Sequence, residues 1–170
     1  MLDICVLGDD VLRTECKDIK VFDSALKMLA DAMLETLKEA DGVGLAGPQV
    51  GVPEKIFVVW IPEEDPLVFI NPEIVETSIE TCPYEEGCLS VPGMYHNVVR
   101  PKRVKVQAFD ADGKPFTLDA DGLLARVIQH ENDHLHGKLY IDYLTDAERE
   151  KLLRLYEKKN KARKNRKRRV

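Results

Sequence analysis

The 170-residue sequence lacks a long hydrophobic run. No stretch approaches the ~18 consecutive apolar residues that a membrane-spanning helix needs. The opening residues, Met1-Leu-Asp-Ile, also lack the basic and apolar regions of a secretory signal. These absences predict a protein that is kept in the cytoplasm and does not bind a membrane.

Cysteine is scarce, with four residues at Cys5, Cys16, Cys82 and Cys88. Without a secretory signal we expect these thiols to be reduced and not paired in disulfides. The length is that of one domain, which we assign to residues 1–170. A domain of this size buries about two-thirds of its unfolded surface without disulfides.

The glycine-rich block at residues 42–51 lacks the Lys and Ser/Thr of a phosphate loop, so its G-x-G does not indicate nucleotide binding. One interpretation is simply the end of a helix followed by a turn. The other is a binding loop, in which Gly42 and Gly44 let a peptide backbone approach closely. The Gln49 side chain would then donate an N–H to a developing oxyanion.

Charge is unevenly spread along the chain. Residues 158–170 contain nine Lys/Arg and no acid, while the rest has 16 basic and 30 acidic side chains, a formal charge of −14. This basic tail fits two interpretations: a solvated end, or a segment that docks on a polyanion such as ribosomal RNA.

The central motif is H-E-x-x-H at residues 130–134. Two histidines four residues apart lie on one face of a helix, where both imidazoles can bind one divalent cation. Glu131 is then placed to take a proton from water and return it. The preceding apolar residues predict a helix, with Asp121 as a candidate N-cap and Gly137 as a stop.

The third metal ligand is open from the motif alone. Tyr140 stands where a metzincin would need histidine. Cys88 is the preferred ligand, because one thiolate and two imidazoles leave a fourth position free, as in catalytic sites. Cys82 as a fourth protein ligand would close that position. A gluzincin-type peptidase would instead use a downstream glutamate, of which the chain has Glu148, Glu150 and Glu157.

Three blocks in this order resemble the signature motifs of peptide deformylase. They are G-x-G-L-A-x-x-Q at 42–49, E-G-C-L-S at 86–90 and Q-H-E-x-D-H-L at 129–135. The resemblance covers about residues 4–157. It implies an α+β fold, in which small mixed or antiparallel sheets pack around a central metal-binding helix, with an N-terminal and a C-terminal helix.

The resemblance also implies a function. The family removes the formyl group from N-terminal formyl-methionine of nascent peptides, releasing formate, and some members act at the ribosome. The metal would be Fe²⁺, which Zn²⁺, Ni²⁺ or Co²⁺ can replace, and its ligands Cys88, His130 and His134. Catalysis would use Glu131, Gln49 and the backbone N–H of Leu89. The expected substrate-binding residues are Val43, Gly44 and Leu89.

Two positions depart from the family pattern. Gly47 stands where the family usually has alanine, which we expect to loosen the loop that holds Gln49. Tyr95 stands where bacterial relatives often have arginine, so contacts beyond the methionine are expected to differ. A non-catalytic module that docks on ribosomes or stores metal is the alternative from another functional class.

Hydrophobic periodicity predicts the remaining elements. A helix begins at Asp23 or Ser24 and ends near Asp41, and a second begins at the capping box Thr145–Glu148 and fades into the basic tail. Strands are expected over residues 55–60, 67–70, 73–80, 97–100, 103–109 and 115–118.

Overall fold

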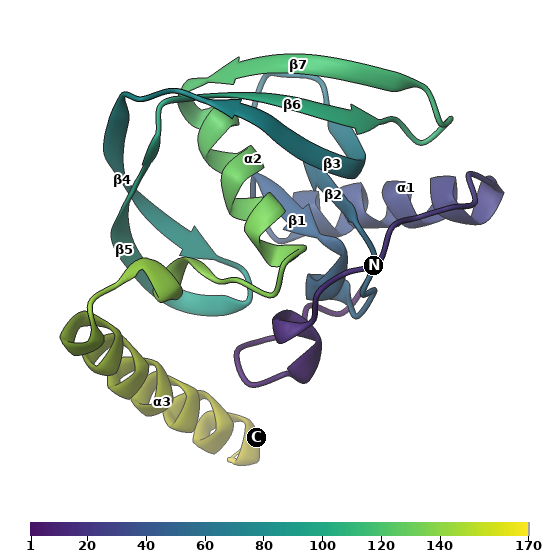
Figure 1. Ribbon diagram of the computed structural model, residues 1–170. Coiled ribbons are helices and arrows are strands. Elements are labelled where there is room, and N and C mark those ends of the chain that lie inside the picture. The colour runs from purple at the N-terminus through teal and green to yellow at the C-terminus, as the bar shows by residue number, and fades with distance from the viewer. Residues whose placement is uncertain (170) are drawn as a thin grey trace.

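A single helix, α2 (Gly122–His134), lies at the centre of the fold in the computed structural model, which describes residues 1–169 (Figure 1). A five-stranded antiparallel sheet covers one side of it, in the order β1-β2-β3-β6-β7. A two-stranded antiparallel sheet, β4-β5, lies on another side. The predicted α+β fold around a central helix is confirmed. The strand bounds are β1 Gly44–Ala46, β2 Ile56–Val59, β3 Leu67–Thr77, β4 Thr81–Cys88, β5 Val91–Pro101, β6 Arg103–Phe109 and β7 Pro115–Asp121.

The two other long helices begin where their capping residues predict. In α1 (Ser24–Glu39) the Asp23 carboxylate accepts the Leu26 N–H at 3.0 Å. In α3 (Asp146–Arg168) Thr145 and Glu148 form the expected reciprocal capping box. However, α3 continues to Arg168, so most of the basic tail is helical. Short 3-10 helices occupy η1 Asp10–Arg13, η2 Gly47–Val50 and η3 Tyr140–Tyr143.

Both faces of strand β2 are buried, and this makes the sheet the middle layer of the molecule. Phe57 and Val59 point into the core that α2 covers. Ile56 and Val58 point to the opposite face, into the core that α1 covers. Successive side chains of a strand face opposite ways, so a continuous apolar run is what a sheet covered on both faces requires.

The structure differs from the predicted strands at residues 67–88. The two strands predicted over 67–70 and 73–80 are one strand, β3, which runs through Asn71 at φ 50° with two irregularities in register. Asn71-Pro72 reads as a turn in sequence because Asn tolerates this backbone conformation. Strand β4 was not predicted, since its residues lack a regular apolar alternation.

The C-terminal end of α2 is held by the N-terminal part of the chain. The regular helix ends at His134, and Gly137 closes the turn that follows, as predicted: its N–H donates to His134 O at 3.2 Å, and the Lys138 N–H donates to Asp133 O at 3.0 Å. The Asp121 side chain makes no capping hydrogen bond although Asp121 is the N-cap residue. The Cys16 N–H donates to Leu135 O at 2.9 Å. Gly137, at φ 69°, lies so close to Arg13 that an added Cβ would be 2.8 Å from its backbone.

Two further predictions concern absences. All four cysteines are free, as expected. Within residues 1–169, no helix combines the length and apolar composition needed to cross a membrane.

The close approach at Gly137 predicts the effect of adding one methyl group. Gly137→Ala places a Cβ in strained backbone and against Arg13, whereas Gly51→Ala meets the same backbone strain at φ 80° with open space around it. The Gly51 variant should therefore lose about 1 kcal/mol, or about 3 °C in Tm, and the Gly137 variant at least twice as much. Thermal unfolding of the metal-loaded proteins measures this. Equal losses of Tm in the two variants would contradict a close contact between Gly137 and Arg13.

Candidate metal centre

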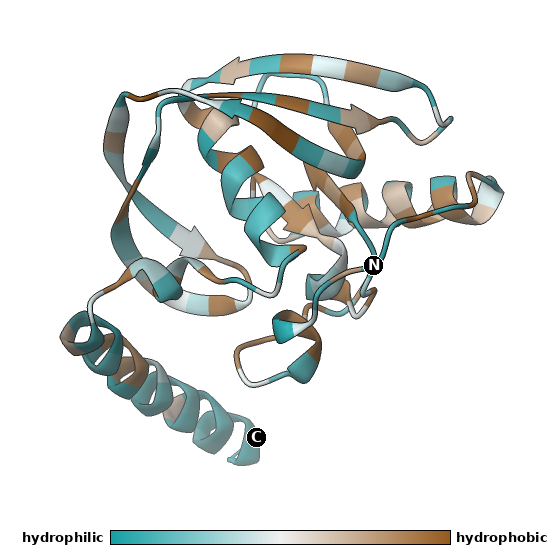
Figure 2. Ribbon diagram, viewed as in Figure 1, coloured by the Kyte–Doolittle hydropathy of each residue, from teal (hydrophilic) through white to brown (hydrophobic). Residues whose placement is uncertain are grey.

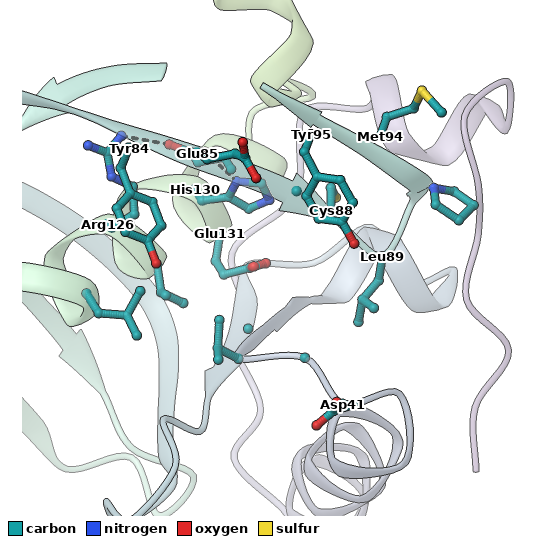
Figure 3. Close-up of a pocket in the computed structure, with 18 of the residues that line it drawn as sticks. Asp41, Tyr84, Glu85, Cys88, Leu89, Met94, Tyr95, Arg126, His130 and Glu131 are labelled. Carbon is teal, nitrogen blue, oxygen red and sulfur yellow. Dashed lines mark hydrogen bonds and ion pairs between the residues drawn. The ribbon is translucent and has the colours of Figure 1, made fainter. Parts of the chain in front are cut away.

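Three ligand atoms from two elements converge beside α2. Cys88 lies at the end of β4, and His130 and His134 lie one turn apart on α2. One ligand atom from each residue lies within 4.8 Å of the other two. Cys88 Sγ is 3.4 Å from Nε2 of His134. Cys88, His130 and Glu131 line the same pocket, and Figure 3 shows His130 next to Glu131.

This donor set fits a catalytic divalent metal. One thiolate and two imidazoles are three protein ligands, which leaves a coordination position free for substrate or water. The His130 ring is also oriented as a ligand, because its Nδ1 contacts Glu86 Oε1 at 2.8 Å and its other nitrogen faces the site. Nδ1 of His134 has no partner within residues 1–169.

The alternative ligands lie elsewhere. Glu148, on α3, pairs with His96 at 3.0 Å. Cys82 Sγ is 3.6 Å from Nη2 of Arg126. Over the described part of the chain, the grouping of potential metal ligands is Cys88, His130 and His134. The gluzincin arrangement and the four-ligand arrangement therefore have no geometric support.

Glu86 is the residue that sequence reasoning missed. Its carboxylate is buried and accepts hydrogen bonds from Arg100 Nε at 2.7 Å and from Arg126 Nη1 at 2.8 Å, besides contacting His130. Burial alone would raise its pKa, but the bonds from His130 and Arg100 outweigh burial and lower the pKa to about 2. Glu86 therefore stays ionised and fixes the first histidine.

The two arginines extend this network to other elements. Nη1 of Arg100 donates to Asp133 Oδ2 on α2 at 2.8 Å, and Asp133 also accepts from Tyr143 OH at 2.8 Å. Arg126 donates to the backbone oxygens of Val98 and Cys82, each at 2.8 Å. The sequence gives one hint that Glu86 lies beside the metal site. Glu86 precedes Cys88 by two residues, and residues at that spacing lie on one face of a strand.

Glu131 lies at the inner end of the pocket. It is 3% exposed, and its Oε2 has no partner within residues 1–169. Burial raises its pKa to about 7. A Cβ at Gly44 would be 2.6 Å from Glu131 Oε1, so glycine is required for the carboxyl group to approach β1 this closely.

Gln49 is fixed by hydrogen bonds at both ends of its amide. Its Oε1 accepts the Ala46 N–H at 2.9 Å, and its Nε2 donates to Ser90 Oγ at 3.1 Å and to Cys88 Sγ at 3.6 Å. The expectation that Gly47 loosens this loop stays a prediction. A Cβ there would be 2.8 Å from two backbone oxygens, so Gly47 permits tight packing.

A cavity of about 450 Å³ opens beside Cys88 and His130. The predicted substrate-binding residues Val43, Gly44 and Leu89 all line it, together with Leu123 and Val127. These walls are mostly apolar. Tyr84 and Tyr95 lie at its rim, and both side chains are more than half exposed (Figure 3). The cavity suits an apolar side chain next to a polar group at the inner end.

Removing the charge of Glu86 should weaken both the fold and the metal site. Glu86→Gln leaves two buried guanidinium groups facing a neutral amide, at a cost of about 3–5 kcal/mol. It also removes the group that orients His130, which should lower metal affinity about 10- to 100-fold. Glu85→Gln, one residue away and exposed, is the matched control. Chemical denaturation and metal titration of both variants check this; similar behaviour of the two would exclude the proposed role of Glu86.

Comparisons with known proteins agree with this site. The family model described as polypeptide deformylase matches residues 1–150. Peptide deformylase 1 of Pseudomonas syringae is 48% identical over 163 residues, covering 95% of this chain and 97% of the relative.

Solved structures give the same result. The crystal structure of a peptide deformylase from Legionella pneumophila has a TM-score of 0.91 and 41% identity, covering 96% of this chain and 97% of that one. That of peptide deformylase from Ehrlichia chaffeensis in complex with actinonin has a TM-score of 0.90 and 38% identity, with coverage of 94% and 97%. The chain therefore belongs to the polypeptide deformylase family, whose members are metal-dependent hydrolases that remove the formyl group from the N-terminus of nascent peptides.

Proposed function

We propose that the chain carries out this hydrolysis on N-terminal formyl-methionine, with Cys88, His130 and His134 as the metal ligands and Glu131 as the acid–base residue. The observation that carries the proposal is the convergence of the three ligand atoms, within 4.8 Å of one another, with the Glu131 carboxyl group and the Gln49 amide at the inner end of one cavity. The reaction needs each of these groups.

The metal is proposed to be Fe²⁺, with Zn²⁺, Ni²⁺ or Co²⁺ able to take its place. A thiolate with two imidazoles suits each of these borderline cations. When bound, the cation supplies a Lewis acid that polarises the formyl oxygen and acidifies water. An iron–thiolate site is oxygen-sensitive and therefore favours a reducing environment, so we place the reaction in the cytoplasm. We assign residues 1–170 to one catalytic domain.

Glu131 is proposed to move the proton. Its carboxylate accepts a proton as water adds to the formyl carbon, and it returns the proton to the amine nitrogen as the carbon–nitrogen bond breaks. The products are formate and a peptide with a free amino terminus. Oε2 of Glu131 has no partner among residues 1–169, which supports this role, because a buried carboxylate oxygen needs a hydrogen-bond partner and water or substrate can be that partner.

Gln49 and Leu89 are proposed to stabilise the negative charge that develops on the formyl oxygen. Of the two Gln49 Nε2 contacts, the one to Ser90 is the shorter, and the one to Cys88 Sγ points toward the metal ligands. The backbone N–H of Leu89, next to Cys88, is the second donor. One such donor typically contributes about 3 kcal/mol to transition-state stabilisation.

The substrate is proposed to place its methionine side chain against the apolar walls of the cavity. Val43, Leu123 and Val127 line these walls. Its backbone would pass beside Gly44, which lines the cavity. At the rim, Tyr95 offers the second and third residues of the peptide an aromatic surface in place of a charge.

Glu131→Gln should keep the metal and lose turnover. The amide is nearly isosteric but cannot accept the proton, so kcat should fall by about 10²–10⁴-fold or more. Formate release from a formyl-Met dipeptide, with anaerobically Fe²⁺-loaded protein, measures this. Near-normal turnover would require another base.

Cys88→Ser is the contrasting variant, because it removes a ligand and keeps Glu131. It should lose metal, and its Co²⁺-substituted form should lack the thiolate-to-metal charge-transfer absorption that the Glu131 variant retains. Survival of that absorption in the serine variant would transfer the ligand role to another thiol.

The basic end of α3 is proposed to bind ribosomal RNA. From Glu157 onward nearly every residue of the helix is exposed, and Figure 2 shows this end as mostly hydrophilic. Lys159 is directed inward, with its Nζ 3.5 Å from Gly93 O, and Arg163 lies one turn further on the same face. The opposite face carries Lys161, Lys164 and Arg168, which are free to contact phosphate.

Neutralising that outer face should weaken ribosome binding without affecting chemistry. The Lys161→Gln, Lys164→Gln, Arg168→Gln variant should pellet less with ribosomes at low salt. Its log–log salt dependence should become shallower by about three phosphate contacts. Cleavage of a small formyl-Met peptide should hardly change.

The matched control replaces three exposed lysines of the body, Lys20, Lys102 and Lys114, with Gln. It changes net charge equally but leaves the helix intact. If the control loses as much ribosome binding as the α3 variant, the helix is only a solvated end.

A further inference from the structure

Two backbone hydrogen bonds connect the extended N-terminal residues Cys5–Leu7, here called the N-terminal strap, to the back of the site. The Cys5 N–H donates to the backbone oxygen of Gln49 at 2.7 Å. The Leu7 N–H donates to the backbone oxygen of Ser90 at 2.8 Å. Because alternate residues of an extended chain face the same way, residues 5 and 7 can bind both segments at once.

The two segments that the strap joins come from different sheets. Gln49 lies in η2, directly after β1 of the five-stranded sheet. Ser90 lies in the turn between β4 and β5, two residues after Cys88. Within residues 1–169 no strand of one sheet pairs with a strand of the other. The distance between the Gln49 amide and the Cys88 turn is therefore not fixed by either ladder.

Side-chain contacts hold the strap itself in place. Leu7 packs on the core that contains Val91 and Tyr156. Because Tyr156 belongs to α3, the strap and this helix share one core. The purple N-terminal segment can be followed between the end of α2 and α3 in Figure 1. Val6, between the two anchoring residues, has an exposed side chain, and its N–H donates to Asp9 Oδ2 at 2.8 Å.

We infer that the strap is a positioning element for the reaction: by binding Gln49 and Ser90 together, its backbone sets the Gln49 amide relative to the Cys88 turn. The inference rests on the proposed role of Gln49. The Gln49 side chain bridges to the same turn at Ser90 Oγ, 3.1 Å away. A single side-chain bond can shift with the loops that carry it, whereas two backbone bonds from one strap restrain both loops.

A backbone ester at Leu7 tests this without changing any side chain. Cys16 allows a synthetic segment of residues 1–15 to be ligated to residues 16–170, and the full chain is then refolded with Co²⁺. The α-hydroxy acid corresponding to Leu7 replaces its N–H by oxygen and removes the bond to Ser90. The control is the corresponding ester at Val6, which removes a bond of similar length to the exposed Asp9.

The Leu7 ester should lower kcat by up to about tenfold, the most that one neutral hydrogen bond contributes. KM should stay within about twofold and the thiolate–Co²⁺ absorption should persist, since binding and ligation use other groups. The Val6 ester should lower Tm by about as much as the Leu7 ester does, and it should leave kcat unchanged.

Equal effects of the two esters on kcat, or an effect of the Leu7 ester on Tm alone, would overturn the inference and leave the strap as a structural contact. Failure of the proposed function is distinguishable, because the ligated chain without an ester would then release no formate from a formyl-Met peptide.

Discussion

The buried carboxylate of Glu86 is the interaction on which the rest of the structure depends. Glu86 contacts Arg100, Arg126 and His130 and is only 4% exposed. Water therefore cannot take the place of a lost partner. Taking several charges out of water is costly, and the cost is offset only when each charge is paired in good geometry. The network therefore tolerates little movement. The same rigidity holds the imidazole of His130 in the orientation that a metal ligand needs.

This network also explains how two separate sheets share one site. Glu86 belongs to β4 and Arg100 to β5, while Arg126 and His130 belong to α2. Through Arg100 it reaches Asp133, near the end of the same helix. The two-stranded sheet is thus attached to α2 by ion pairs, whereas the five-stranded sheet is attached to α2 by an apolar core. The ion pairs place Cys88 beside the two histidines, and the apolar core places Gly44 beside Glu131.

The ends of the chain complete the arrangement. Residues before η1 lie against the loops that carry Gln49 and Ser90, and Arg13 lies against the turn after α2. The first half of α3 packs on the same core as Leu7, through Leu152 and Tyr156. Lys159 contacts Gly93, which lines the cavity. The inner face of α3 therefore lies beside a residue that lines the cavity.

The sequence by itself determined the ligand types, the helix that carries two of them and the amphipathic helices on either side. Their signals are local: H-E-x-x-H needs only the helical repeat, and the caps at Asp23 and Thr145 act within one turn. Only the tertiary structure decided that β3 is one strand through Asn71 and that Glu86 binds two buried arginines. Arg100 and Arg126 lie 14 and 40 residues from Glu86, and no sequence periodicity links them. Such pairings depend on which charges the packed sheets and helix leave without water, and that is settled only when the chain is folded.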